Sequence, residues 1–257
     1  MGDVLIVACG GGAGSALRDY SENHDKDNSR FEDLDTISNA MTTATIEEFR
    51  KKFKRYRVVV PFIILGGSFG MDRIREIIDM ARESGCKVVS VFGIPMEFEI
   101  ERRERALRSL TSFSSSSDCS FVIDMQRFFG ITKDQETKMW NDFIMASNRT
   151  LMFCVSSLVD YLSGPFFSTF TKQMYSFTYH SGMIPEDTVA EGWNGLLFDQ
   201  NPELDDVIVM VSRDTNSSEI DGIRNRIARD HGVLPQIIRR SDAESTKFLI
   251  FRAVRSF

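Results

Sequence analysis

The sequence has few of the residues that build metal sites and disulfides. It contains four cysteines and three histidines among 257 residues, and the cysteines lie far apart without a C-x-x-C pair. No histidine has a nearby cysteine or a second histidine. Cys86 and Cys119 adjoin apolar runs, as buried reduced thiols do. We therefore expect neither disulfides nor a protein metal site.

The chain also lacks a long hydrophobic run and an excess of basic residues. No stretch approaches the roughly 20 apolar residues that span a bilayer, and the first residues do not resemble a signal peptide. The net charge is -6, and basic residues are mixed with acidic ones, as in 101–105. We expect a cytoplasmic protein with no transmembrane segment and no nucleic-acid partner.

Two common phosphate-binding motifs are missing as well. The sequence has no G-x-x-x-x-G-K-[ST], and G-x-G-x-x-G is not completed, because Ser15 stands at its last glycine. Four glycines nevertheless follow the apolar run 4–7 within five residues: Gly10, Gly11, Gly12 and Gly14. Such a cluster lets the backbone wrap closely around a phosphate. It is also typical of a tight strand-to-helix turn that needs positive φ angles, and both interpretations stay open.

Strands and helices alternate along the first half of the chain. Continuous apolar runs predict buried strands, and helical spacing of apolar or charged residues predicts the helices between them. Pro61 is awkward in its run, because proline cannot donate to a ladder. Thr45 is expected to cap a helix, with Glu48 completing a capping box. The expected strands are 4–7, 58–65, 88–92 and 120–124, and the expected helices are 45–56, 71–84 and 99–110.

The stretches between these elements read as loops. Residues 17–30 are highly polar and predict a short helix turn followed by an exposed loop, and 112–118 is a polar tract. Alternating strands and helices at this spacing predict the α/β class with a Rossmann-like, mostly parallel sheet.

The second half begins with a different pattern. Residues 140–162 have enough apolar positions for one long, largely buried helix, which Gly164 and Pro165 would stop. A helix-like segment at 170–179 follows. The remainder predicts a smaller α+β domain of β-α-β type, with strands at 207–211 and 247–254 and a helix at 218–231.

Two more motifs follow the first glycine cluster in order. A second glycine loop reads G-G-S-F-G-M-D and consists of Gly66, Gly67, Ser68, Phe69, Gly70, Met71 and Asp72. The sequence P-M-E-F-E begins at Pro95 and ends at Glu99, and Arg102 and Arg103 follow it. Taken alone, 99–105 is also typical of a solvated helix face with i,i+4 ion pairs.

In their order, these motifs resemble those of the FtsZ/tubulin superfamily, as in FtsZ-like and CetZ-like proteins. The resemblance implies a nucleotide-binding, GTPase-like domain over 1–135, a central helix over 136–163 and a smaller domain over 164–257. It implies that GTP or GDP binds at both glycine loops, with Mg²⁺ beside the phosphates. By position, Glu99 would accept hydrogen bonds from ribose hydroxyls and Arg103 would lie over the nucleotide.

Several positions depart from the family pattern. Asp72 adds a carboxylate where phosphate oxygens would lie, and a carboxylate repels phosphate unless a metal ion intervenes. The acidic residue that reads the guanine edge falls near Met145, although Asp142 or Asn148 could approach with a small register shift. The acidic loop that positions the attacking water corresponds to 164–172, which contains no carboxylate. We therefore assign no catalytic residue.

That same loop carries three phenylalanines, Phe166, Phe167 and Phe170. They are either anchors at a subunit junction or packing beneath the smaller domain. The first functional hypothesis is a protein that forms a filament by self-association or regulates another FtsZ/tubulin-like filament. The second is a non-enzymatic scaffold or capping protein with a decayed nucleotide site. A third is an unrelated doubly wound enzyme with a dinucleotide or methyl-donor cofactor, for which Asp33 or Asp35 would end the second strand.

Overall fold

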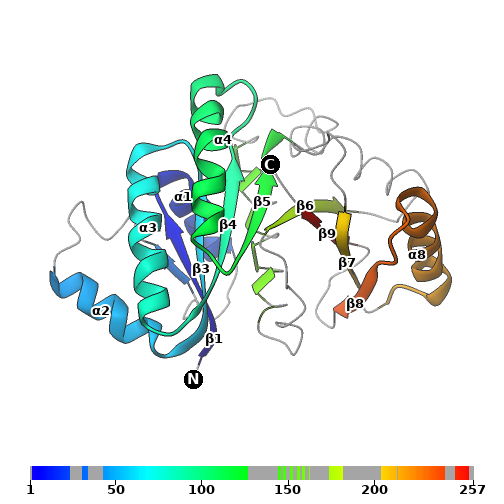
Figure 1. The fold of residues 1–257 in the computed structure, drawn as a ribbon, viewed down its shortest axis with the longest axis horizontal. Helices are drawn as coiled ribbons and strands as arrows, with labels where there is room; N and C mark the ends of the chain where they lie inside the picture. Colours follow the sequence, from blue (N-terminus) through cyan, green and yellow to red (C-terminus); the bar gives the residue numbers. More distant parts are fainter. Residues whose placement is uncertain are drawn as a thin grey trace. The chain divides into compact units, whose positions relative to one another are not determined.

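The computed structural model divides the chain into two compact units, Met1–Gln173 and Met174–Phe257, and we describe each by itself (Figure 1). The description covers residues 2–23, 31–33, 43–126, 144–145, 147–148, 151–152, 155–156, 158–159, 162, 174–181, 204–212, 214–240 and 247–254. The three-part division at 135 and 163 stays a prediction.

The first unit contains a parallel sheet, as the sequence predicted. Its strands lie in the order β2-β1-β3-β4-β5, and every neighbouring pair runs parallel. β2 is short and was expected only under the dinucleotide hypothesis, which ends a second strand at Asp33 or Asp35. The strands are β1 (Gly2–Cys9), β2 (Phe31–Asp33), β3 (Tyr56–Ile64), β4 (Lys87–Ile94) and β5 (Cys119–Asp124).

Four helices connect these strands: α1 (Gly11–Asn23), α2 (Thr43–Phe53), α3 (Ser68–Glu83) and α4 (Ile100–Ser115). Right-handed crossovers and the strand order put α1 on one face of the sheet and the other three on the opposite face. Figure 1 shows α3 and α4 in front of the strands and α1 behind them. The sheet is therefore covered on both sides.

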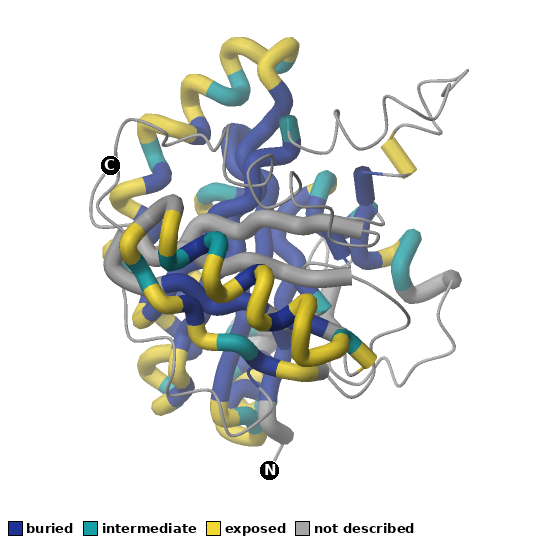
Figure 2. Tube along the Cα trace, turned by 90° about the vertical axis from the view of Figure 1, so that its right-hand side faces the viewer, coloured by how far each residue is buried: buried dark blue, intermediate teal, exposed yellow. Residues whose placement is uncertain are grey.

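Helices on both faces explain why the strands are continuous apolar runs. From Val58 onward every residue of β3 is buried, and so is every residue of β5, as the dark tube through the middle of Figure 2 shows. The pairs between β3 and β4 pass from Val59 with Val88 to Phe62 with Val91 in one register. Pro61 lies between these two pairs and is tolerated there, although it has no N–H to donate.

The helix boundaries differ from the predictions in several places. α2 ends at Phe53 rather than at 56, and α3 begins at Ser68 rather than at 71. α1 runs through Asn23, so the polar stretch after Leu17 starts as a full helix rather than a short turn. α2 begins at Thr43, so Thr45 lies inside the helix and does not cap it. α4 continues through Ser115, because Leu110 and Phe113 are buried and this apolar packing outweighs the turn preference of the serines.

The second unit is a mixed sheet with one described helix. Its strands are β6 (Met174–Ser181), β7 (Leu204–Ser212), β8 (Gln236–Arg240) and β9 (Lys247–Val254), in the order β6-β9-β7-β8. β9 runs antiparallel to β6 and β7, whereas β7 and β8 run parallel. α8 (Ser217–His231) connects the parallel pair. The predicted β-α-β unit took 247–254 as its second strand, but that strand, β9, runs antiparallel to β7, and the unpredicted β8 completes the unit instead.

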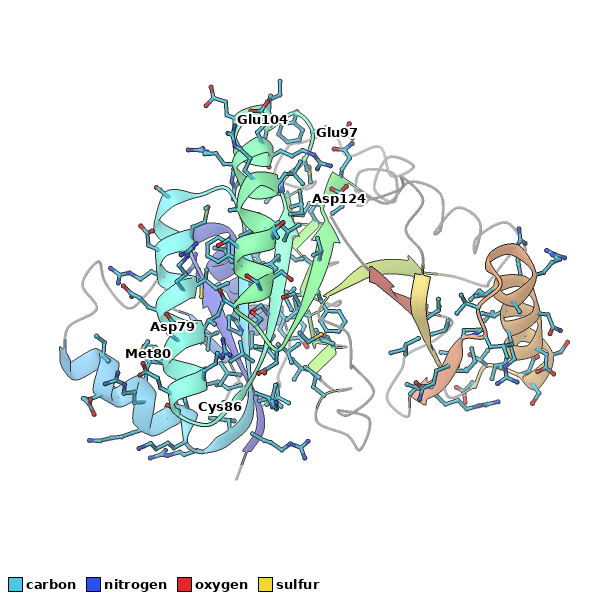
Figure 3. All side chains as sticks on the ribbon, viewed as in Figure 1. Asp79, Met80, Cys86, Glu97, Glu104 and Asp124 are labelled. Atoms are coloured by element: carbon cyan, nitrogen blue, oxygen red, sulfur yellow. The ribbon has the colours of Figure 1, made fainter. Side chains whose placement is uncertain are left out.

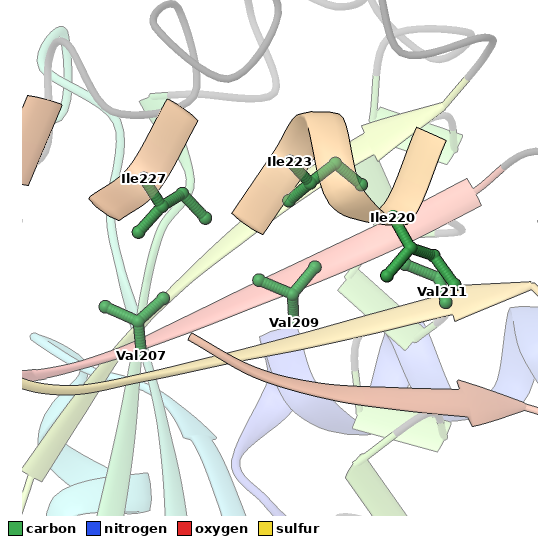
Figure 4. Close-up of a cluster of buried hydrophobic side chains, with 6 residues drawn as sticks. All are labelled: Val207, Val209, Val211, Ile220, Ile223 and Ile227. Atoms are coloured by element: carbon green, nitrogen blue, oxygen red, sulfur yellow. The ribbon is translucent and has the colours of Figure 1, made fainter. Parts of the chain in front are cut away.

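α8 packs on β7 through a small apolar core. Val207, Val209 and Val211 project from alternate positions of the strand toward the helix (Figure 4). Their partners Ile220, Ile223 and Ile227 lie three and four residues apart on α8, which puts them on one helix face. A capping box of Asn216 and Glu219 begins this helix. The unit therefore has a core of its own.

The helix-like segment predicted at 170–179 is wrong, because Met174–Ser181 forms β6. Tyr175, Phe177 and Tyr179 alternate with small polar residues, and a period of two is the signature of a strand. Each pairs with β9. This alternation in the sequence could have predicted the strand.

The predicted central helix is described only in part. Its described positions from 144 to 162 are helical, and those after Asn148 are buried except Ser156, whereas Ile144 and Met145 are partly exposed. Among the described residues, no helix is both long enough and apolar enough to cross a bilayer.

The described cysteines are structural rather than reactive. Cys9, Cys86 and Cys119 are buried, which confirms the predicted burial of the last two. Burial raises the pKa of the Cys119 thiol strongly and that of Cys86 to a lesser degree, which keeps both in the neutral form. The Cys86 Sγ–H donates to the carbonyl of Phe53 at 3.2 Å, which ties the end of α2 to the start of β4.

Candidate nucleotide site

The two predicted glycine loops follow neighbouring strands of the first sheet. β1 leads into α1, and the chain then returns to β2 on one side of β1. β3 lies on the other side of β1 and leads into α3. The strand order therefore reverses between β1 and β3. In open α/β sheets, ligands bind outside the carboxyl ends of the strands at such a switch point.

The first glycine loop is a tight turn from β1 into α1. Gly10 has a φ of 83°, a conformation that favours glycine, and its carbonyl accepts a hydrogen bond from the Gly14 N–H at 2.9 Å. Gly11 and Gly12 begin the helix, and Ser15 lies half-buried in its second turn. The first N–H groups of α1 therefore lie at the carboxyl end of β1.

The second glycine loop makes the same kind of turn after β3. Gly66 has a φ of 87°, and Gly67 precedes α3 in an extended conformation without a side-chain cap. Ser68, Phe69 and Gly70 form the first turn of α3, in which Ser68 is exposed and Gly70 buried. The N-cap residue of α3 therefore supplies no side-chain acceptor to the first backbone N–H groups of this helix.

The two turns touch through their backbones. A Cβ added to Gly10 would lie 3.1 Å from the Cα of Gly70. A Cβ on Gly70 would lie 2.9 Å from the Ile63 Cδ1 and 3.2 Å from the Cys9 carbonyl oxygen. Side chains at these two positions would force the turns apart. The glycines therefore set how closely the starts of α1 and α3 approach each other.

The third motif meets both turns at the start of α4. A Cβ on Gly66 would lie 2.2 Å from the main-chain oxygen of Arg102, so only glycine fits beneath this turn of α4. One on Gly12 would lie 3.6 Å from the Arg102 Nη2. Glu99 lies at the N-cap position of α4, and its Oε2 is 2.6 Å from the Arg102 Nη1. The structure therefore brings the glycine loops and Glu99 together.

Arg103 has a different surrounding. Its Nη1 lies 2.9 Å from the Asp124 Oδ1 and its Nη2 3.1 Å from the Oδ2, a bidentate pair at the end of β5. The Arg103 Nη1 also donates to the Pro95 carbonyl. The two side chains are only 14% and 7% exposed. The predicted contact of Arg103 with a nucleotide stays a prediction, and this pairing does not favour it.

Sequence reasoning missed Asp124 as part of this site. Figure 3 labels Asp124 at the tip of β5 and Glu97 at the same end of the unit. The backbone N–H of Glu97 donates to the Gln126 Oε1 at 3.0 Å, and that of Gln126 donates to Asp124 at 3.1 Å. Asp124 therefore joins the loop before α4 to the end of β5. The available signal was a carboxylate at the end of a mostly apolar strand.

One polar contact links α1 to the central helix. The Asn148 Nδ2 donates to the Asp19 Oδ2 at 2.7 Å, and Asn148 is buried. Asn148 was one of the two alternatives for contacting a base edge, and it now has a carboxylate partner on α1. The other alternative, Asp142, lies outside the described residues, and Met145 is 41% exposed.

The described residues fit a phosphate ligand better than a protein-bound metal. Two helices that begin at glycine turns, one of them without a side-chain cap, suit an anion. No three His, Cys, Asp or Glu side chains gather among the described residues. A Mg²⁺ ion would therefore rely on phosphate oxygens and water, as this ion commonly does. Asp72 is exposed on α3.

Of the remaining predicted positions, the structure describes only Asp33. The loop 164–172, with its three phenylalanines, lies outside the described residues. Asp33 ends β2, which neighbours β1, so its place in the chain also fits the dinucleotide interpretation. Asp35 lies outside the described residues.

Replacing Asp124 with alanine should destabilise the protein, because the Arg103 guanidinium would stay buried without its carboxylate. We expect the free energy of unfolding to fall by about 3 kcal/mol, measured by urea denaturation. Arg108 and Glu104 form an exposed pair at 3.8 Å, so Arg108→Ala is the control and should cost less than ~1 kcal/mol. Equal losses in the two variants would contradict the assigned role of the Arg103–Asp124 pair.

Comparison with known proteins bears on the fold. No protein-family model and no curated protein matches the sequence. Solved structures do match. An empty FtsZ dimer from M. jannaschii superposes with a TM-score of 0.71 at 13% identity, over 99% of this chain and 89% of that one. A mutant FtsZ from M. jannaschii gives 0.70 at 12%, over 98% and 91% of the two chains.

CetZ from Methanosaeta thermophila gives a TM-score of 0.67 at 15% identity, over 100% of this chain and 88% of that one. All three likenesses cover nearly the whole chain at low identity, so they bear on architecture. They confirm the resemblance drawn from the order of the motifs. The chain has the fold of FtsZ and CetZ.

Proposed function

We propose that the chain is a cytoplasmic, tubulin-like cytoskeletal protein that binds a guanine nucleotide at the switch point between β1 and β3 and self-associates or regulates a related filament. The contact between the Gly10 and Gly70 turns carries this proposal. It brings two helix starts to one place, and each adds backbone N–H donors and a positive dipole end for an anion.

The space next to Gly67 supports the same site. A Cβ on Gly67 would meet nothing within 4 Å, in contrast to Gly10, Gly66 and Gly70. Its φ of -89° and ψ of 137° are ordinary for any residue. Packing and backbone conformation therefore give no reason for glycine here. A ligand that approaches the backbone closely would give one.

The Asp19–Asn148 pair is our candidate for the contact with the base. Asp19 lies eight residues beyond Gly11 on α1, which is about 12 Å along the helix axis from its start, on the side away from the phosphates. A carboxylate accepts hydrogen bonds only, so it suits the two N–H groups on the edge of guanine. Adenine does not present that pair of donors. The arrangement favours guanine over adenine.

Hydrolysis by the family's acidic loop is not part of the proposal, because 164–172 contains no carboxylate. The internal pairing of Glu99 with Arg102 and of Arg103 with Asp124 favours a second candidate, a scaffold or capping protein whose nucleotide site has decayed. A nucleotide-binding measurement separates the two candidates.

The first test is nucleotide binding to the whole chain, measured by calorimetry with GDP and GTP. Gly67→Ala should bind about tenfold more weakly or worse, because its methyl group occupies the space where a phosphate would lie, and tenfold corresponds to 1.4 kcal/mol. Gly222→Ala is the matched control, since a Cβ there also meets nothing within 4 Å and Gly222 lies on α8 in the second unit. If the wild-type protein does not bind GDP or GTP at millimolar concentration, the proposed nucleotide site is wrong.

Self-association is tested by sedimentation with and without GTP. A filament-forming protein should pellet in a nucleotide-dependent manner, and Gly67→Ala should pellet less because it loses the ligand. A monomer in every condition, with nucleotide bound, would contradict self-association and leave regulation of another filament. A monomer without nucleotide affinity would support the scaffold.

Base selectivity is tested with Asp19→Asn. We expect the preference for GTP over ATP to fall by about tenfold, because an amide presents one acceptor where the carboxylate presents two. Competition between the two nucleotides measures the ratio. Asp79→Asn is the control, since Asp79 is exposed on α3 (Figure 3) and its loss should leave the ratio unchanged. An unaltered ratio in Asp19→Asn would remove this residue from the base contact.

A further inference from the structure

Arg102 is a cation that lies against both glycine turns. Its main-chain oxygen would be 2.2 Å from a Cβ on Gly66, and its Nη2 would be 3.6 Å from a Cβ on Gly12. The backbone of Arg102 thus packs on the second turn while its guanidinium lies at the first. Both turns belong to the site proposed above, so the following inference rests on that function.

Only part of the Arg102 guanidinium is hydrogen-bonded within the described part of the chain. Its Nη1 donates to the Glu99 Oε2 at 2.6 Å, and its Nη2 makes no hydrogen bond within the described part of the chain. The other oxygen of Glu99, Oε1, accepts a long hydrogen bond of 3.4 Å from the Met96 N–H. The donors of Nη2 are therefore available next to the start of α1.

The neighbouring Arg103 differs from Arg102 in its hydrogen bonds and in its exposure. Both of its terminal nitrogens are paired with Asp124, at side-chain exposures of 14% and 7%. Arg102 and Glu99 are 34% and 27% exposed. Breaking a buried pair leaves a charge without a partner, whereas breaking a more exposed one costs little because water replaces the partner. Only the Arg102 pair is therefore easy to exchange.

We propose that Glu99 and Arg102 form an exchangeable ion pair, in which the phosphates of a bound nucleotide take Arg102 from Glu99. A guanidinium binds phosphate with two parallel hydrogen bonds, and a diphosphate carries more charge than the carboxylate that it displaces. Once released, the Glu99 carboxylate accepts hydrogen bonds from the ribose hydroxyls. Phosphate binding thereby prepares the acceptor for the ribose.

This exchange also distinguishes ligands. A bare phosphate chain gains Arg102 and leaves Glu99 without a new partner, so it loses the energy of the original pair. A nucleoside has no anion to displace Glu99 from Arg102. A nucleotide satisfies both side chains at once. The pair therefore makes recognition of phosphate and ribose cooperative.

The test compares inorganic pyrophosphate with GDP by calorimetry. Arg102→Ala should weaken the binding of both by about tenfold or more, and Arg102→Lys should recover part of the loss. Glu99→Gln should bind pyrophosphate several times more tightly, because nothing then competes for Arg102, while the advantage of GDP over pyrophosphate shrinks. Arg105→Ala is the control, since Arg105 is exposed on the same helix and its loss removes the same charge.

The outcomes separate this inference from the proposed function. Equal affinities of Arg102→Ala and Arg105→Ala for GDP, with wild-type binding intact, would overturn the inference alone. Weaker pyrophosphate binding by Glu99→Gln would overturn it too, since Glu99 would then hold Arg102 in place for the ligand rather than compete with it. Wild-type protein that binds neither ligand would overturn both. Circular dichroism of each variant checks that the fold is kept.

Discussion

The backbone contact between Gly10 and Gly70 is the constraint on which the first unit depends. A Cβ on Gly10 would lie 3.1 Å from the Gly70 Cα, and one on Gly70 would lie 3.4 Å from the Gly10 Cα. β1 and β3 are neighbouring parallel strands, so their helices must begin side by side. With no side chain between them, the two turns meet directly. A site walled by backbone rather than by side chains can persist while most of the sequence changes, which is consistent with a common fold at 12–15% identity.

The two arginines at the start of α4 have different partners, and our proposal gives them different roles. A side chain that fixes the end of β5 to the preceding loop must be buried and fully paired, as Arg103 is with Asp124. A side chain that changes its partner when a ligand binds needs unused hydrogen-bond donors and an ion-pair partner that the ligand can displace. Adjacent residues on a helix are turned by about 100° from each other. Arg102 and Arg103 therefore face different surroundings at the same height of the helix.

The sequence predicted the elements whose burial creates a local pattern. The run 58–65 predicted β3 and the spacing of Ile74, Ile77 and Ile78 predicted α3, because burial on both faces or on one face leaves a period in the chain. The two glycine turns were predicted for a similar reason, since few other residues fit there. β6 was missed although Tyr175, Phe177 and Tyr179 alternate. The end of α4 was missed because the burial of Phe113 depends on packing against the sheet.

The choice of partner among charged side chains could not be predicted in this way. The resemblance carried by P-M-E-F-E and the two arginines after it implies a carboxylate and a cation at the nucleotide, but either arginine could pair with Glu99. Asp124, at the end of β5, pairs with Arg103, 21 residues away in the sequence, which leaves Arg102 to pair with Glu99. A contact between residues so far apart leaves no periodic pattern in the sequence. Because a ligand shifts an equilibrium only by its differential affinity for the two states, the pairing in the free protein determines what the ligand must displace. Under the proposed function, the charged side chains beside the glycine turns, rather than the glycines, therefore determine how strongly the chain responds to a nucleotide.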